Sequence, residues 1–266
     1  MLTTPKPGLV DSNNNGSHHD MNVESFKKSA AALYPYFEQC LKIGFEGTEA
    51  SPDSTFHKLR LAGLEAEKEM YFATNGVNTH KGIIYSMGVL LCTIGKTWSP
   101  VNPFSDIDKV FKECSRLVEE SVKNDLEAID KSTAGGRLYL STGEKGIRGE
   151  VSQGFPSVKN ISLPVFCKAF EEGKNKNDAG IVALLHLMGS IYDTSVYNRG
   201  GEEGVYYAQK YANKILSQKS FDHGDILKMD LDFIKKNLSP GGAADLLAIT
   251  YFINDLKDYT TNSSNE

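Results

Sequence analysis

Residues 79–96, THKGIIYSMGVLLCTIGK, and residues 178–197, DAGIVALLHLMGSIYDTSVY, are the two stretches that decide the fold. Both are apolar on nearly every side when they are drawn as helices, which is typical of helices that other helices cover. The longest apolar run is broken by Gly88, Thr93 and Gly95, so it is not a membrane span. The sequence therefore predicts two central buried helices.

Amphipathic patterns surround these two stretches. Their apolar residues recur every three or four positions, which is the spacing of one helix face. The patterns cover residues 22–44, 53–72, 105–129, 202–217, 222–237 and 243–256. Only residues 137–142, RLYLST, alternate like a strand, and one short strand cannot form a sheet. The expected fold class is all-α.

The domain organisation is expected to be simple. No Pro/Ser-rich linker or block of charge divides residues 1–258, which predicts a single globular helical domain. The polar tail at residues 259–266 is expected to fray. Residues 132–164 hold six glycines between two predicted helices, and this length and content indicate a long glycine-rich active-site loop.

Composition excludes several kinds of protein. The 266 residues include 29 Lys and Arg against 34 Asp and Glu, a net charge of −5, and no basic run indicates a nucleic-acid partner. The four cysteines are scattered among apolar residues, which favours free buried thiols in a reducing compartment. With no apolar signal segment at the N-terminus, we expect a cytoplasmic protein that does not bind a membrane.

Polar residues and glycines crowd together in five segments at the ends of predicted helices. These segments are residues 6–21, 74–82, 143–156, 192–201 and 239–245. Helix N-termini bind anions, and glycine lets a ligand approach the backbone closely. The segments mix cations with carboxylates, so if they converge they suit a polyphosphate held together with a divalent metal.

Two of the segments place charge where helix stability does not require it. His80 and Lys81 lie in the first turn of a predicted helix, where the helix dipole disfavours cations. Asp193 follows an apolar helix face, where a carboxylate is costly to bury unless it binds a metal, pairs with a cation or moves a proton. Arg199 is equally plausible as a structural partner of Asp193, so both interpretations stay open.

The other three segments have plainer alternatives. Residues 6–21 would cap the first helix in any case, although their density of donors and acceptors favours a ligand site. Residues 143–156 are also consistent with a solvated loop that carries surface ion pairs. For residues 239–245, an ordinary helix start is as plausible as a ligand site.

Five long motifs together resemble one protein family, the triphosphoribosyl-dephospho-coenzyme A synthases. The motifs are TPKPGLVD with NNGSHHDM (4–21), ATNGVNTHKGIIY (73–85), GIRGEVSQGFPSV (146–158), LLHLMGSIYDTSVYNRGG (184–201) and LSPGGAADLLAITYF (238–252). They run in the family's order over essentially the whole chain. Ser195 stands where the family pattern has Asn, and a helix that precedes the first motif in relatives is expected to be missing here.

The resemblance implies an α-helical transferase. The 2′-hydroxyl of 3′-dephospho-coenzyme A would attack C1 of the ATP ribose, adenine would leave and the triphosphate would stay on the product. ATP and dephospho-coenzyme A are then the substrates, Mg²⁺ is expected with the triphosphate, and the product would pass to a citrate lyase acyl-carrier transfer step. The alternatives are a nucleotide N-glycosidase that uses water and a non-catalytic nucleotide sensor.

This chemistry suggests roles for the polar residues of the five segments. Displacement at an anomeric carbon develops oxocarbenium character and needs a base, for which Glu150 or Asp193 is suited, while His18 or His80 would protonate adenine. The candidate Mg²⁺ ligands are Asp20, Asp193 and Asp245. The candidate substrate-binding residues are Lys6, Asn14, Ser17, Asn78, Lys81, Lys145, Arg148, Arg199, Gly200, Gly201, Gly241 and Gly242.

Overall fold

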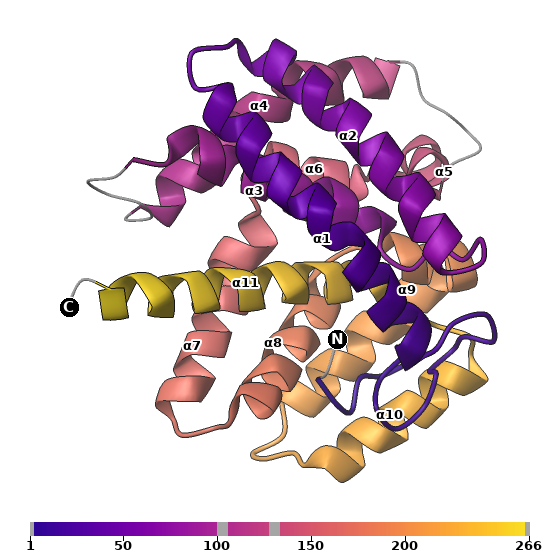
Figure 1. Ribbon diagram of the computed structural model, residues 1–266. Coiled ribbons are helices and arrows are strands. Elements are labelled where there is room, and N and C mark those ends of the chain that lie inside the picture. Colours follow the sequence, from indigo (N-terminus) through magenta and orange to yellow (C-terminus); the bar gives the residue numbers. More distant parts are fainter. Residues whose placement is uncertain (1–2, 100–105, 128–133, 264–266) are drawn as a thin grey trace. The chain divides into compact units, whose positions relative to one another are not determined.

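Figure 1 shows the computed structural model, which describes residues 3–99, 106–127 and 134–263. Every regular element in these ranges is helical, which confirms the all-α prediction. The elements are α1 (Val23–Glu46), α2 (Pro52–Ala73), α3 (Lys81–Thr97), α4 (Ile107–Glu127), α5 (Ala134–Thr142), α6 (Gly146–Ser152), the π-helix η1 (Val158–Ser162), α7 (Leu163–Glu171), α8 (Lys176–Ser190), α9 (Thr194–Leu216), α10 (His223–Lys235) and α11 (Gly241–Ser263).

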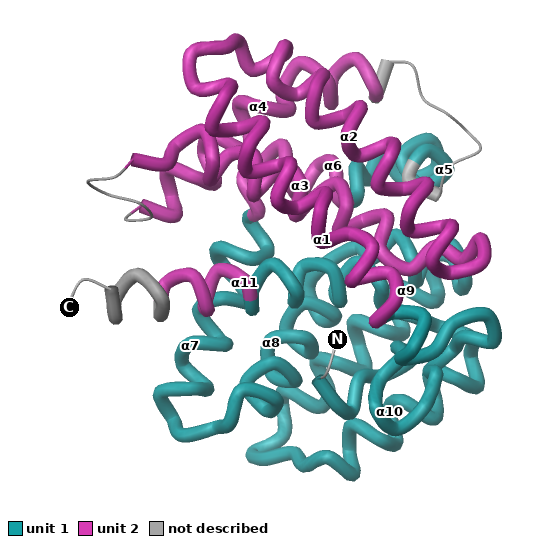
Figure 2. Tube along the Cα trace, viewed as in Figure 1, with its two compact units in different colours: residues 1–26, 130–146, 156–251 teal, residues 27–129, 147–155, 252–266 magenta. Residues whose placement is uncertain are grey.

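The chain divides into two compact units, which Figure 2 colours separately. Unit 1 comprises Met1–Phe26, Asp130–Gly146 and Pro156–Tyr251. Unit 2 comprises Lys27–Ile129, Ile147–Phe155 and Phe252–Glu266. Each unit is therefore assembled from segments that are far apart in the sequence. The single domain over residues 1–258 stays a prediction, and helix α11 continues into the predicted tail as far as Ser263.

Unit 2 is built around α3, the first of the two predicted buried helices. Helices α2, α3 and α4 pack on one another, and the α3 residues from Val89 to Gly95 are all buried. Helix α1 approaches α3 through glycines. A Cβ atom on Gly44 would overlap the carbonyl oxygen of Cys92, and one on Gly95 would overlap that of Leu41. These two positions therefore admit no larger residue unless a backbone moves.

Unit 1 contains the second predicted buried stretch. Helix α8 packs between α7 and α9, and α5 packs on α9. The prediction of one helix over residues 178–197 is wrong, because α8 ends at Ser190 and α9 begins at Thr194. Asp193 causes the break: its carboxylate accepts hydrogen bonds from the backbone N–H groups of Ser195 and Val196 and so caps α9.

Residues 132–164 are not the long loop that the sequence predicts. Their described part contains α5, α6 and η1, and α5 covers the residues 137–142 that alternation assigns to a strand. A lone strand would leave its backbone groups unpaired, whereas a helix pairs them internally and buries Leu138. The glycines act at the breaks, where Gly143, Gly146 and Gly154 have positive φ.

Two further predictions concern the environment of the chain. In the part of the chain that the structure describes, no single helix is long and apolar enough to cross a membrane, and only α8 and α9 taken together pass that test, across a bend of 54°. The cysteines are free, as predicted. Burial raises the pKa of the Cys40, Cys92 and Cys114 thiols to about 12, so these three are structural rather than reactive.

Candidate active site

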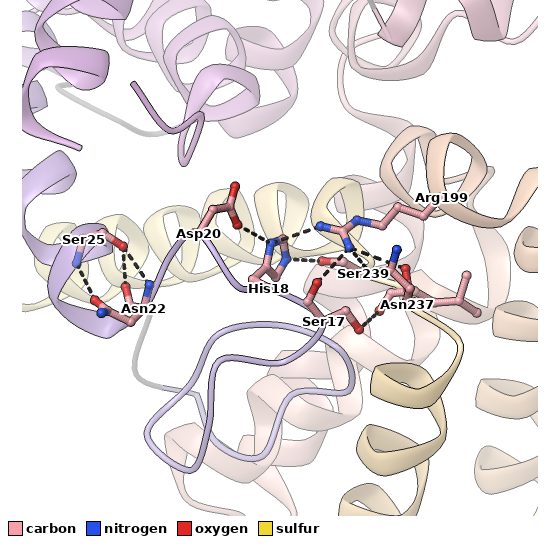
Figure 3. A network of polar contacts seen from close by, with 9 residues as sticks. Ser17, His18, Asp20, Asn22, Ser25, Arg199, Asn237 and Ser239 are labelled. Atoms are coloured by element: carbon pink, nitrogen blue, oxygen red, sulfur yellow. Dashed lines mark hydrogen bonds and ion pairs between the residues drawn. The ribbon is translucent and has the colours of Figure 1, made fainter. Parts of the chain in front are cut away.

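One polar network in unit 1 joins the N-terminal loop to α9 and to the segment before α11 (Figure 3). Arg199 is its centre. Its Nη1 donates to the carbonyl oxygen of Ser17 at 2.8 Å and to Oδ1 of Asn237 at 2.7 Å. Its Nη2 lies 3.1 Å from His18 Nδ1, and His18 Nε2 lies 2.8 Å from Ser239 Oγ. The network fixes both the loop and the imidazole ring.

The same contacts determine where His18 carries its proton. A guanidinium group cannot accept a hydrogen bond, so Arg199 donates and His18 Nδ1 accepts. The proton of the neutral ring is then on Nε2, which donates to Ser239. Burial and, after it, the charge of Arg199 lower the pKa of His18, which Asp20 at 3.7 Å opposes. His18 is therefore a neutral hydrogen-bond donor at neutral pH.

Two acidic side chains hold the N-terminal loop in place. Asp11 accepts a hydrogen bond of 2.8 Å from the backbone N–H of Lys6. Asp230 of α10 accepts one of 2.8 Å from the N–H of Gly8 and one of 2.7 Å from the side-chain amide of Asn14. The loop is thus tied to a helix more than two hundred residues away in sequence.

The predicted binding side chains of this loop are largely occupied. The Asn14 amide group donates to Asp230, and its oxygen accepts from the N–H of Gly16 at 2.6 Å. Ser17 Oγ donates to the carbonyl oxygen of Leu238 at 2.6 Å. The Lys6 side chain is buried, and burial lowers its pKa to about 8. In the described structure Asn14 and Ser17 support the loop.

The N-termini of α9 and α11 meet at Asp193. Its Oδ1 accepts from the N–H groups of Ser195 and Val196, and its Oδ2 accepts from the N–H of Ala243 at 2.8 Å. The contact from position 195 uses the backbone, so the departure of Ser195 from the family pattern leaves it intact. Because the guanidinium group of Arg199 is bound to His18 instead, the interpretation of Arg199 as the structural partner of Asp193 is wrong.

Asp245 lies one turn into α11, where the negative charge of Asp193 acts on its carboxyl group. Burial and, after it, the charge of Asp193 raise the pKa of Asp245 to about 8. Burial also raises the pKa of Asp193, but four backbone N–H groups oppose this by stabilising its charge. Asp193 is therefore the member of the pair whose negative charge the backbone stabilises, and Asp245 is the member that keeps its proton near neutral pH. A cation or a basic ligand group beside the pair would release that proton.

The predicted glycines differ in what surrounds them. A Cβ atom on Gly200 would meet Leu238 Cδ2 at 2.7 Å, and one on Gly241 would meet Ser195 Oγ at 2.7 Å, so a larger residue at either position would displace a neighbouring side chain. A Cβ atom on Gly242 would lie 3.0 Å from the carboxylate of Asp193. Gly201 has a φ of 60° and breaks α9 with open space around its Cβ position. Only Gly201 leaves room for a ligand to approach.

The predicted residues 74–82 belong to unit 2, at the start of α3. Asn78 Oδ1 accepts from the backbone N–H of Lys81 at 3.2 Å. Lys81 Nζ forms an ion pair of 2.8 Å with Glu67 of α2. The placement of Lys81 in a first turn therefore has a structural reason, which its local sequence does not reveal.

His80 is oriented by two hydroxyl groups. Thr79 Oγ1 donates to Ser29 Oγ at 2.7 Å, and Ser29 Oγ lies 2.7 Å from His80 Nδ1. The Ser29 hydroxyl group has a donor and two acceptor lone pairs, so it bonds to Thr79 and His80 together and fixes the orientation of the imidazole ring.

The remaining predicted residues lie in or near α6. Lys145 is exposed, and Glu150 is half-buried. Arg148 lies 3.7 Å from Asp125 of α4, which also binds Arg60 of α2. Sequence reasoning missed Arg60 and Asp125 because both are charged residues of amphipathic helices, where such charges ordinarily need no explanation.

The structure thus distributes the predicted site over both units. Unit 1 brings together His18, Asp20 and Arg199 in one network, and Asp193 and Asp245 in another. The residues of unit 2 are Asn78, His80, Lys81, Arg148 and Glu150. Within residues 3–99, 106–127 and 134–263, no three His, Cys, Asp or Glu side chains form a group that could hold a metal by themselves.

Known proteins resemble the chain over its whole length. A match to the CitG family, described as ATP:dephospho-CoA triphosphoribosyl transferase, spans residues 1–264. A Pectobacterium atrosepticum protein named 2-(5''-triphosphoribosyl)-3'-dephosphocoenzyme-A synthase is 40% identical over 258 residues, 95% of this chain and 84% of that protein. A Salmonella choleraesuis protein named "Probable 2-(5''-triphosphoribosyl)-3'-dephosphocoenzyme-A synthase 1" is 38% identical over 256 residues, covering 94% of this chain and 84% of that protein.

A solved structure supports the fold. A crystal structure from Archaeoglobus fulgidus, described as a "putative triphosphoribosyl-dephospho-coA synthase", superposes with a TM-score of 0.56 at 20% identity and covers 86% of this chain and 96% of that one. The helical fold and these matches define the class of protein: it is an all-α transferase. The chain belongs to the CitG family of ATP:dephospho-CoA triphosphoribosyl transferases. The resemblance seen in the five motifs is confirmed.

Proposed function

We propose that this chain performs the family's transfer with the Asp193–Asp245 pair at the centre of its active site. In the reaction, the bond between C1 of the ATP ribose and adenine breaks, and a bond from C1 to the 2′-oxygen of 3′-dephospho-CoA forms. The hydroxyl group loses a proton and adenine gains one, so no other reactant is needed. The triphosphate stays on the transferred ribose.

The observation that carries the proposal is the pair of carboxyl groups at the N-termini of α9 and α11, where Asp193 accepts hydrogen bonds from both helices and burial and the charge of Asp193 raise the pKa of Asp245. Two helix N-termini stabilise the negative charge of Asp193, and glycines line the start of α11. A carboxyl group with a pKa of about 8 exchanges its proton near neutral pH, which suits it to acid–base work or to binding a cation in exchange for that proton.

Mg²⁺ is part of the proposal. It usually takes one or two protein carboxylates and fills its other positions with water and phosphate oxygens, so a cage of three side chains is not required. Asp245 with Asp193 fits this requirement better than Asp20, whose side chain is 61% exposed and lies beside His18. When bound, the ion would neutralise charge on the triphosphate.

The histidines and Glu150 handle protons in this proposal. His18, whose Nε2–H donates to Ser239 in the chain without substrate, and His80 are the two candidates to protonate the nitrogen of the departing adenine. Glu150 stays the candidate to accept the proton of the attacking hydroxyl group. Delivery of the product to a citrate lyase acyl-carrier step, and a cytoplasmic location, rest on the family resemblance and on the sequence.

Adenine release tests the proposal directly. The full chain is incubated with ATP and Mg²⁺, with and without 3′-dephospho-CoA, and free adenine is measured by chromatography. We expect adenine only when the acceptor is present, in equal amount to the coupled product. Adenine formed without acceptor would identify a hydrolase, and ATP binding with no adenine under either condition would identify a sensor.

A further inference from the structure

Three side chains from three helices of unit 2 lie around the carboxylate of Asp125 on a fourth helix, and the proposed transfer assigns a role to none of the four residues. Asp125 of α4 binds Arg60 of α2, with Nη1 and Oδ1 3.0 Å apart. It also attracts Arg148 of α6, with Nε and Oδ2 3.7 Å apart. The third side chain is Tyr85 of α3, whose pKa responds to the charges of the other three residues.

The charges in this cluster do not balance. Two guanidinium groups face one carboxylate, which leaves one excess positive charge. Arg60 makes one hydrogen bond to Asp125, and Arg148 at 3.7 Å makes a charge contact that is longer than a hydrogen bond. Each guanidinium group has five N–H donors, so most of them are directed elsewhere. Their side chains are 51% and 40% exposed, which makes those donors accessible to a ligand.

Tyr85 supplies an independent observation that points to a ligand. Its hydroxyl oxygen is buried, and among the described residues it has no hydrogen-bond partner. Burial raises the pKa of Tyr85, so the hydroxyl group is a neutral donor throughout the physiological range. An unpaired buried hydroxyl group destabilises a protein, and phenylalanine would fill the same space without that penalty. A purely structural ion cluster gives no reason for tyrosine here.

We propose that Arg60, Arg148 and Tyr85 form a phosphate-binding subsite in which Asp125 positions the two arginines. A phosphate ester offers several acceptor oxygens and at least one negative charge, which matches two accessible guanidinium forks and one neutral hydroxyl donor. The negative charge of Asp125 offsets the repulsion between the two guanidinium groups when no ligand is bound. The subsite rests on the proposed function, because its ligand is a phosphate of one of the two substrates.

Both substrates carry this chemistry. The group that binds is either the triphosphate of ATP or the diphosphate of 3′-dephospho-CoA. Equilibrium binding to the full chain, measured by calorimetry with each substrate separately and in the absence of turnover, distinguishes them. The variants are Tyr85→Phe and Arg60→Gln. The matched control is Arg116→Gln, because Arg116 is also exposed and paired with an acid, Glu113, but lies outside the cluster.

For one substrate, we expect Arg60→Gln to raise the dissociation constant about tenfold and Tyr85→Phe about fivefold, while Arg116→Gln leaves it unchanged. We also expect Tyr85→Phe to unfold at a urea concentration no lower than the wild type. If the variants bind only ATP more weakly, the subsite binds the triphosphate. If they bind only dephospho-CoA more weakly, it binds the diphosphate. Unchanged affinity of both variants for both substrates would overturn the subsite.

The stability measurement excludes a structural explanation. If Tyr85→Phe unfolds clearly more easily than the wild type, the hydroxyl group has a partner within the fold and the subsite loses its main support. Because binding is measured without reaction, its result is separate from the transfer reaction. If the variants bind both substrates as the wild type does, the subsite is refuted, even if adenine is released. If no adenine is released, the proposed function is refuted, even if the variants bind weakly.

Discussion

The Asp193–Asp245 pair shows how two neighbouring carboxyl groups of one residue type acquire different surroundings. Asp193 is buried and accepts hydrogen bonds from the backbone N–H groups of two helix N-termini, whereas Asp245 is half-buried and the charge of Asp193 acts on it. The backbone dipoles favour the ionised form of Asp193 and thereby the protonated form of Asp245. Pairs of acids with separated pKa values are typical of sites that transfer protons or bind cations.

The first prediction concerns Asp245→Asn and stability. The carboxyl group of Asp245 has a pKa of about 8 in the folded chain and about 4 in the unfolded chain. Between these pH values only the folded state keeps the proton, so the free energy of unfolding of the wild type falls as pH rises. The variant lacks this loss. We expect it to exceed the wild type by several kcal/mol at pH 8, up to about 5 from the separation of the two pKa values, and to match it near pH 4 in urea unfolding. Equal stability at both pH values would contradict the raised pKa.

The second prediction concerns Arg199→Ala and His18. Arg199 lowers the pKa of His18 by its charge and by its donation to Nδ1. Its removal should raise that pKa toward the ordinary value of histidine, as measured by proton NMR titration of the ring. Lys210→Ala, which removes a cation from the same helix near Tyr206, is the control and should leave the titration of His18 unchanged. A lowered or constant pKa in Arg199→Ala would show that the network does not set the state of His18.

At the scale of helices, glycine determines how closely α1 can approach α3. Two glycines, Gly44 and Gly95, each face a carbonyl oxygen of the other helix, so the contact is between backbones. Such a contact tolerates no added methyl group, because neither backbone has a flexible end that could move aside. The small residues within the apolar stretch 79–96 therefore serve packing.

The third prediction tests this contact. Gly44→Ala should destabilise the protein by about 2–3 kcal/mol in urea unfolding, since its Cβ atom would overlap the carbonyl oxygen of Cys92. Gly63→Ala in α2 is the control, because its Cβ atom would make an ordinary contact of 3.4 Å with Tyr36. That variant should be neutral or slightly more stable, owing to the higher helix propensity of alanine. Similar losses in both variants would argue against the close contact.

The helices could be predicted from the sequence better than their boundaries. Periodicity located α1, α2 and α10 because each hides one apolar face, and that pattern is local. The break at Asp193 was not predictable, because the same carboxylate also accepts a hydrogen bond from Ala243, fifty residues further on. Likewise, residues 137–142 alternate like a strand, and only their packing on α9 makes them a helix.

At the scale of the whole molecule, the sequence predicts which segments form the candidate site. It does not predict which residues of those segments contact one another. The motifs identified the family and directed attention to His18, Asp193 and Arg199. They did not show that Arg199 binds His18 rather than Asp193, or that Lys81 pairs with Glu67. Such pairings depend on which helices pack together, and residues as distant as Arg60 and Asp125 give no sign of their contact along the chain.

The rate of adenine release by Asp245→Asn, with ATP, Mg²⁺ and 3′-dephospho-CoA, tests the central claim most directly. The variant should stay folded, and Asp53→Asn, which changes an exposed acid at the start of α2, is the matched control. We predict that kcat falls at least about 100-fold in Asp245→Asn and is unchanged in Asp53→Asn. A folded Asp245→Asn variant that releases adenine at the wild-type rate would contradict the account.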